Sequence, residues 1–166
     1  MAAKIAGASA IVAVDVNDAR LTLAQELGAT HAVNGRNDDV RARLRTVAPD
    51  GLDYVVEVTG RPNMLVLALD SIGPMGTAAL VGGPPMGTTA GIDMNTLLHG
   101  GLRLRGIVQG DSMPQIFIPE LVALYQAGKF PFDRLIKRYE LADINQAFAD
   151  AARGDAIKPV VTMPAS

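Results

Sequence analysis

The sequence predicts an α/β fold organised around a doubly wound parallel sheet. Residues 10–14 form an uninterrupted apolar run that ends at Asp15, and a helix signal begins two residues later. An apolar run without alternation is typical of a strand that helices cover on both faces. Further apolar runs alternate with helical stripes, and short turns rich in glycine and proline separate them. Apolar residues make up 49% of the chain and aromatic residues only 4%, which fits an aliphatic α/β core.

The first half alternates regularly between helix and strand. Residues 1–6 resemble the last turns of a helix that stops at Gly7, which suggests that an upstream part is missing. Helices are expected after the N-caps Asn17 and Asn37, with Asp38 and Asp39 in the first turn of the second, and from Pro62 at a first helical position. Strands are expected at residues 10–14, 31–33, 52–58 and 77–81, the last one after a turn at residues 73–76.

In the second half, the predicted helices and strands alternate less regularly. A capping box of Ser112 and Gln115 predicts a helix that kinks at Pro119 or restarts at Glu120. The clearest helical stripe runs from Asp143 to Arg153 and ends at Gly154. The other expected elements are a short helix at residues 93–98 and strands at residues 102–108, 134–136 and 157–163. No internal repeat or linker divides the 166 residues, so we predict a single domain.

Composition argues against several classes of protein. The formal net charge is −2, and no basic cluster extends beyond residues 41–45, so nucleic acid is not an expected partner. There is no cysteine, which excludes disulfides and thiolate metal sites within the chain. We interpret His31 and His99 as structural or surface residues, and we assign no metal ligand. No apolar segment is long enough for a membrane span and no signal peptide is evident, so we expect a soluble, cytoplasmic protein without membrane contacts.

Asp15 is the first candidate functional residue. It lies at the carboxyl end of a predicted buried strand, where open α/β sheets bind ligands. A carboxylate there can accept hydrogen bonds from both hydroxyls of an adenosine ribose, and it repels a 2′-phosphate, which favours NAD over NADP. The alternative is that Asp15 only caps the following helix.

Six strings carry a family resemblance over nearly the whole chain. In this order and with this spacing they resemble the coenzyme-binding half of zinc-dependent medium-chain alcohol dehydrogenases, with its Rossmann-like sheet. The stretch from Gly110 to Ile136 looks most like the aryl-alcohol branch of that family. The six strings are residues 12–20, 27–34, 53–60, 81–84, 143–148 and 157–160.

The resemblance implies an adenosine pocket. Asp15 would bind the ribose hydroxyls, Arg20 would lie alongside the adenosine, and Arg61 would flank the adenine. Val58 and Thr59 would line the same pocket. The alternative for Arg20 and Arg61 is an ordinary solvent-exposed charge.

The resemblance also implies contacts with the rest of NAD. Gly82 and Gly83 would let the backbone approach the nicotinamide, although they also suit a tight turn before two prolines. Val108 and Gln109 would lie along the nicotinamide end of the groove. Lys158 would approach the pyrophosphate as a point charge, or would simply be a solvent-exposed lysine of an edge strand. Glu57 is assigned no role.

The chain lacks three parts of the family pattern. They are the Gly-x-Gly-x-x-Gly turn, the first strand of the sheet, and the catalytic domain that supplies the zinc ligands. In the doubly wound order that first strand is central, so its neighbours would lack ladder partners. We therefore expect a fragment of a longer polypeptide, or strands that close the gap or find a partner.

The resemblance implies the coenzyme-binding part of an NAD-dependent alcohol dehydrogenase that oxidises a primary, possibly aromatic, alcohol to an aldehyde. Zinc would be held only by the missing domain, and the chain alone is predicted to be inactive. Strand pairing through residues 102–108 across a two-fold axis would give a homodimer. The alternatives are a zinc-free quinone or enoyl reductase of the same superfamily, a non-enzymatic dimerisation module, and an unrelated adenosyl-cofactor enzyme such as a methyltransferase.

Overall fold

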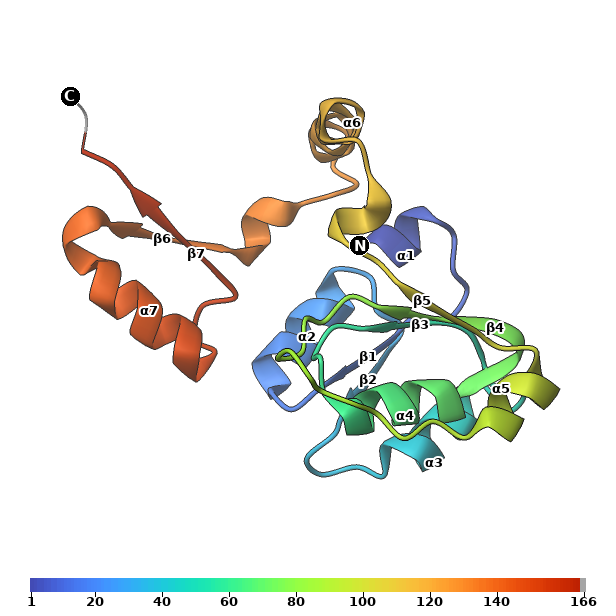
Figure 1. Cartoon of the computed structure of the whole chain (residues 1–166). Coiled ribbons are helices and arrows are strands. Elements are labelled where there is room, and N and C mark those ends of the chain that lie inside the picture. Colours follow the sequence, from blue (N-terminus) through green and yellow to red (C-terminus); the bar gives the residue numbers. More distant parts are fainter. Residues whose placement is uncertain (165–166) are drawn as a thin grey trace.

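A computed structural model describes residues 1–164 and confirms the α/β class (Figure 1). Every strand pair among these residues is parallel. The strands are β1 (Val12–Asp15), β2 (His31–Asn34), β3 (Leu52–Glu57), β4 (Ile72–Leu80), β5 (Arg103–Gly106), β6 (Ile136–Glu140) and β7 (Lys158–Thr162).

Helices connect the strands. The helices are α1 (Ala2–Ile5), α2 (Asp18–Glu26), α3 (Val40–Val47), α4 (Pro62–Asp70), α5 (Met94–Gly100), α6 (Pro114–Gln126) and α7 (Ile144–Arg153). Short 3-10 turns are η1 (Gln109–Asp111), η2 (Phe132–Leu135) and η3 (Leu141–Asp143). Figure 1 shows α1 and α2 on one face of β1–β5 and α3, α4 and α5 on the other. No helix among residues 1–164 is long and apolar enough to cross a lipid bilayer.

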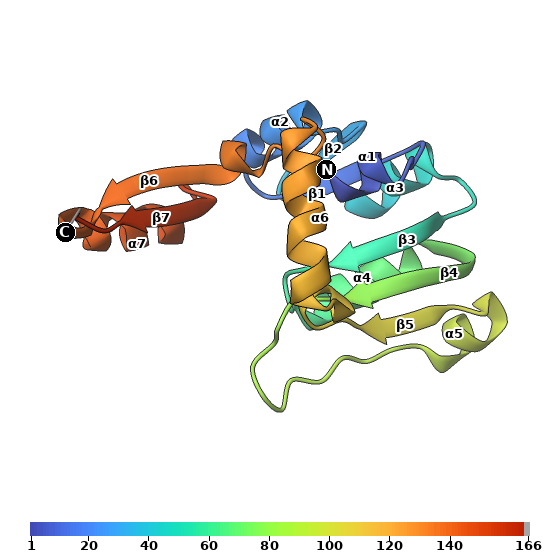
Figure 2. The same ribbon diagram turned by 90° about the horizontal axis from the view of Figure 1, so that it is seen from above.

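The strands form three separate ladders: β1–β2, β3–β4–β5 and β6–β7. Figure 2 shows β1 and β2 beside β3, while β6, α7 and β7 lie apart from this body beyond α6. Hydrogen bonds join β1 to β2 and β3 to β4, but none joins β1 to β3 among the described residues. The parallel sheet that the sequence predicts is therefore divided between these two strands.

Two small clusters of buried side chains hold the molecule together. Leu65 and Leu69 of α4 pack on Ala78 of β4, with partly buried residues of α5 and the preceding loop around them. Tyr139, Ala147 and Ala156 form a second cluster between β6, β7 and α7. The first cluster thus holds α4 against β4, and the second holds α7 against β6 and β7. Neither cluster contains a residue of β1 or β2.

Two predicted N-caps are wrong. Asp39, not Asn37, caps α3, because its Oδ1 accepts the Ala42 N–H at 3.1 Å. Ser112 does not cap α6, because its hydroxyl donates to the Gln109 carbonyl at 2.9 Å. The helix begins two residues later, at Pro114, whose ring pre-sets the helical φ angle. It continues through Pro119 instead of restarting at Glu120.

Three predicted strands also differ from the structure. Residues 73–76 belong to β4, where the register with β3 shifts, and a Cβ on Gly73 would come within 2.5 Å of the Asp50 carbonyl oxygen. Phe132–Leu135 is a 3-10 turn, and β6 starts only at Ile136. β1 is not buried on both faces, since Val14 is 38% exposed beside the division in the sheet.

Candidate functional site

The carboxylate of Asp15 organises the turn at the carboxyl end of β1. Its Oδ1 accepts the backbone N–H groups of Val16 at 2.7 Å and Asn17 at 3.0 Å. The N-cap of α2 is Asn17, whose Oδ1 accepts the N–H groups of Ala19 at 2.9 Å and Arg20 at 3.2 Å. Since Asn17 caps α2, the carboxylate of Asp15 is not needed for that task.

The second carboxylate oxygen of Asp15 remains available for a ligand. Oδ2 accepts no hydrogen bond from the described residues and lies 4.0 Å from Nη1 of Arg20. Nε of Arg20 is buried and has no hydrogen-bond partner among residues 1–164. A buried donor without a partner costs free energy, so this pair of side chains is suited to a ligand that carries hydroxyl groups.

A cavity of about 500 Å³ opens beside Asp15 and Arg20. Residues 15–20 form one wall, Arg36 lies beyond the end of β2, and residues 152–154 at the end of α7 close the third side. Gly154 has φ +84°, and a Cβ there would lie 3.1 Å from Nη2 of Arg20. Glycine therefore lets the end of α7 approach α2.

Sequence reasoning missed Arg36 and Arg153 in this cavity. Arg36 could have been found, because it lies three residues after the predicted strand at residues 31–33, and parallel strands end at the same edge of a sheet. Arg153 could not, because it reaches the cavity only when the end of α7 comes close to Arg20 of α2. The cavity therefore combines the carboxylates of Asp15 and Asp18 with three guanidinium groups from distant parts of the chain.

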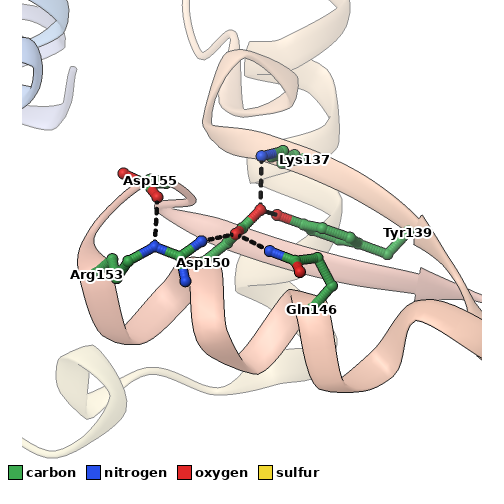
Figure 3. A network of polar contacts seen from close by, with 6 residues as sticks. All are labelled: Lys137, Tyr139, Gln146, Asp150, Arg153 and Asp155. Atoms are coloured by element: carbon green, nitrogen blue, oxygen red, sulfur yellow. Dashed lines mark hydrogen bonds and ion pairs between the residues drawn. The ribbon is translucent and has the colours of Figure 1, made fainter.

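Figure 3 shows what holds Arg153 in place. Its guanidinium donates to the carboxylates of Asp150 and Asp155. Asp150 also accepts hydrogen bonds from Lys137 Nζ at 2.8 Å, Tyr139 Oη at 2.7 Å and Gln146 Nε2 at 2.5 Å. These contacts, that from Lys137 above all, hold the pKa of the Asp150 carboxyl well below its usual range. Asp150 is thus a buried, fully bonded anchor of the C-terminal unit.

A second turn of this kind follows β3. The buried carboxylate of Glu57 accepts the Thr59 N–H at 2.6 Å, the Thr59 hydroxyl, and the Gly60 N–H at 3.0 Å. The Thr59 hydroxyl in turn accepts the N–H of Arg61 at 3.2 Å. Glu57, which had no assigned role, shapes the turn that carries the predicted adenine-pocket residues Val58, Thr59 and Arg61. Its signal in the sequence was an acid at the end of a strand, followed two residues later by a Thr-Gly turn.

Gly82 packs directly against this turn. The N–H groups of Val81 and Gly82 both donate to the Glu57 carbonyl, at 2.9 and 3.0 Å. A Cβ on Gly82 would come within 2.2 Å of the Gly60 nitrogen, whereas one on Gly83 would meet nothing within 4 Å. The close approach at Gly82 is therefore to the Gly60 turn, and contact of either glycine with nicotinamide remains a prediction.

The remaining predicted residues lie outside the Asp15 cavity. Arg61 is exposed at the start of α4. Val108 is 77% exposed, and Gln109 begins η1 with a positive φ of 50°. Lys158 is an exposed residue at the start of β7. The structure thus brings Asp15 and Arg20 together at one site and Val58, Thr59 and Gly82 at another.

No zinc site is present in the part of the chain that the structure describes. No three side chains of histidine, cysteine, aspartate or glutamate come together there in a way that could hold a metal ion.

Comparison with known proteins identifies the family. The zinc-binding dehydrogenase profile matches residues 1–127. Geraniol dehydrogenase from Castellaniella defragrans is 38% identical over 97% of this chain, which spans 43% of that protein. The chain belongs to the zinc-binding dehydrogenase family, as the resemblance in the sequence indicates.

Solved structures agree with this assignment. An alcohol dehydrogenase zinc-binding domain protein from Burkholderia ambifaria superimposes with a TM-score of 0.96 at 51% identity, with 99% of this chain and 44% of that one covered. Benzyl alcohol dehydrogenase from Acinetobacter calcoaceticus has a TM-score of 0.96 at 46% identity, with coverages of 98% and 45%. The chain thus spans less than half the length of these relatives.

Proposed function

We propose that this chain provides the adenosine-binding side of a nicotinamide cofactor site in an alcohol dehydrogenase, and that the cofactor is NAD. The observation that carries the proposal is the unbonded Oδ2 of Asp15 at the carboxyl end of a parallel strand, beside the unpartnered Nε of Arg20. Ribose hydroxyls can donate to the first atom and accept from the second. A 2′-phosphate beside Asp15 would meet a like charge, which favours NAD.

The substrate proposal rests on the relatives. Two of them are named for geraniol and benzyl alcohol, both primary alcohols. We infer that the whole protein oxidises a primary alcohol, aromatic ones included, to the aldehyde. When bound, NAD supplies the acceptor for the hydride that leaves the alcohol carbon. The residues described here would bind and orient its adenosine half.

A test should separate the two halves of the cofactor. We expect calorimetric titration of the purified chain to show binding of NAD and of ADP-ribose with similar affinities. Nicotinamide mononucleotide lacks the adenosine and should give no detectable heat of binding. The proposal fails if neither NAD nor ADP-ribose binds, or if the mononucleotide binds as tightly as NAD.

In this proposal, catalysis also needs the domain that supplies the zinc ligands in the family. We therefore expect no oxidation of benzyl alcohol by the purified chain with NAD, followed as NADH absorbance. Turnover of benzyl alcohol by this chain alone would contradict the proposal that it binds the cofactor but does not catalyse the reaction.

We also propose that β5 mediates dimerisation. Among residues 1–164, β5 pairs with β4 on one side and with no strand on the other, and all four of its residues are exposed. Leu104 in its centre is 39% exposed, which suits a strand that pairs with a second copy across a two-fold axis.

A further inference from the structure

A second cavity, which we call the basic cavity, lies away from Asp15. It has a volume of about 510 Å³, and its walls come from the last turn of α1, the carboxyl end of α2 and the segment that follows α6. The Asp15 cavity is at the amino end of α2. Because α2 has nine residues, a helix about 13 Å long separates the two cavities.

Three cationic side chains and one carboxylate line the basic cavity. Arg134 pairs through Nη2 with the carboxylate of Glu26. Lys4 and Lys129 form no ion pair within residues 1–164. Three positive charges and one negative charge give the lining a net charge of +2, although the whole chain has a formal net charge of −2. Such a local excess of positive charge attracts an anion.

Two of the three cations are held in position by their neighbours. The stem of Lys4 lies on Gly28, where a Cβ would come within 2.6 Å of the lysine Cδ. Gly28 also has a φ of +116°, so glycine permits both this turn and the close approach of Lys4. Glu26 holds Arg134, whose Nε and Nη1 donate to no acceptor among residues 1–164. Cations fixed in advance lose less conformational entropy when an anion binds.

The other side chains of the lining are apolar. Ile5 is 40% exposed, while Leu27 and Pro131 are half-buried. An inorganic ion would leave these side chains in water, whereas an anion with an apolar body would cover them. A concave apolar lining with a few polar groups is typical of a site for a small organic molecule.

We propose that the basic cavity binds a small organic anion that carries a phosphate group on an apolar body. The net charge of +2 matches the two negative charges of a phosphate monoester. The phosphate accepts hydrogen bonds from the two lysines and from Nε and Nη1 of Arg134. The apolar body lies against Ile5 and Leu27. This inference rests on the lining of the basic cavity and not on the cofactor proposal.

Calorimetric titration with four probes tests both parts of the ligand. Phenyl phosphate holds both parts, inorganic phosphate only the anion and phenol only the apolar body, while benzoate has a single charge. At pH 8 a phosphate monoester is doubly charged, because its second pKa is about 6. We expect phenyl phosphate to bind about tenfold more tightly than inorganic phosphate. Benzoate should bind more weakly than phenyl phosphate, and phenol should give no detectable heat.

Substitutions localise the binding site. Lys4→Gln and Lys129→Gln should each weaken the binding of phenyl phosphate about three- to tenfold. Arg43→Gln, on the exposed side of α3, removes a charge outside both cavities and should have no effect. Arg36→Gln removes a cation from the Asp15 cavity and should also bind phenyl phosphate as the wild type does.

Amide chemical shifts of the wild type give a second readout that needs no variant. Phenyl phosphate should shift the signals of Ile5, Gly28 and Lys129 and leave that of Asn17 unchanged. Wild-type affinity in both lysine variants, loss of binding in Arg36→Gln alone, or shifts confined to residues 15–20 overturns the proposal. So does phenyl phosphate that binds no more tightly than inorganic phosphate. No detectable binding, expected if these cations only stabilise the helix ends, overturns it as well.

Discussion

Oδ2 of Asp15 and Nη1 of Arg20 lie 4.0 Å apart, beyond hydrogen-bond distance, at the mouth of one cavity. Oδ1 of the same carboxylate is fully used by two backbone N–H groups. The carboxylate is therefore held rigidly by one oxygen while the other faces the cavity. A binding group positioned in this way loses little conformational entropy when a ligand arrives.

The contribution of Arg20 to cofactor binding should be modest. Arg20→Gln removes a partly exposed charge and the buried Nε donor, and we expect NAD affinity to fall by about three- to tenfold. Calorimetric titration measures this change. Arg43→Gln, on the exposed side of α3, is the matched control and should bind NAD as the wild type does. Equal affinities for all three proteins would remove Arg20 from the site.

Glu57 should matter for stability as well as for the turn after β3. Glu57→Ala leaves the N–H groups of Thr59 and Gly60 without their acceptor, and we expect a loss of about 1–3 kcal/mol in the free energy of unfolding. Urea unfolding measures the loss, and hydrogen exchange at Thr59 and Gly60 should accelerate. Glu120→Ala on the exposed side of α6 is the control. A Glu57→Ala protein of wild-type stability would show that the turn does not depend on this carboxylate.

The Asp150 cluster should make stability depend on pH at the acidic end. The pKa of Asp150 is lowered in the folded state, chiefly by the hydrogen bond from Lys137 and then by those from Tyr139 and Gln146. The stabilisation is therefore complete above the ordinary aspartate pKa of about 3.9 and is lost as the pH falls below it. Thermal unfolding at a series of pH values should show this decline, and Asp150→Asn should flatten it. Asp155→Asn, whose carboxylate is exposed, should keep most of it. Identical pH profiles for wild type and Asp150→Asn would contradict the assignment.

The same cluster predicts a loss of stability at alkaline pH. The bond to Asp150 raises the pKa of Lys137, and burial followed by the bond to Asp150 raises the pKa of Tyr139. Both groups therefore stabilise the fold fully below their ordinary pKa values of about 10.4 and 10, and this stabilisation is lost as the pH rises further. Tyr139→Phe removes one of the two groups and should reduce the decline above about pH 10. Ultraviolet titration of the tyrosines, compared between wild type and variant, checks the shift directly.

Dimerisation through β5 should be sensitive to Leu104. Leu104→Lys keeps the backbone N–H but brings like charges together across a two-fold axis, so we expect mainly monomer in sedimentation velocity. Leu104→Pro, which removes the N–H, should act in the same direction. Leu98→Lys, on a side chain of α5 that is 74% exposed, is the control. A sedimentation profile that none of these substitutions alters would rule out β5 as the interface.

The sequence predicted the class of fold because its strongest signals are local. Asn17 as a cap, Pro62 at the start of α4 and Gly154 at the end of α7 are confirmed, and each depends only on neighbouring residues. The error at Asn37 arose because a second capping side chain, that of Asp39, lies two residues further on, and the hydroxyl of Ser112 instead donates to the carbonyl of Gln109. The bulge at residues 73–76 arises from contacts with another strand, which a single-sequence pattern does not contain.

Only part of the candidate site was predicted, because some of its residues carry a local sequence signal and others do not. Asp15 is visible in the sequence because it ends an apolar run, and Arg36 follows a similar run. Arg153 reaches the cavity because the end of α7 lies close to Arg20, and the role of Glu57 depends on how its side chain folds back onto the next turn. Such long-range and side-chain geometry needs the three-dimensional structure.

Cofactor selectivity at Asp15 tests the central claim most directly. We would titrate NAD and NADP into the wild type and into Asp15→Asn, with Asp50→Asn in an exposed turn as the control. The wild type and the control should bind NAD more tightly than NADP. In Asp15→Asn, NAD should bind about tenfold more weakly and NADP more tightly, because the 2′-phosphate then lies near Arg20 and Arg36 without the opposing charge of Asp15. Unchanged affinities for both cofactors in Asp15→Asn would show that the adenosine ribose does not bind at Asp15.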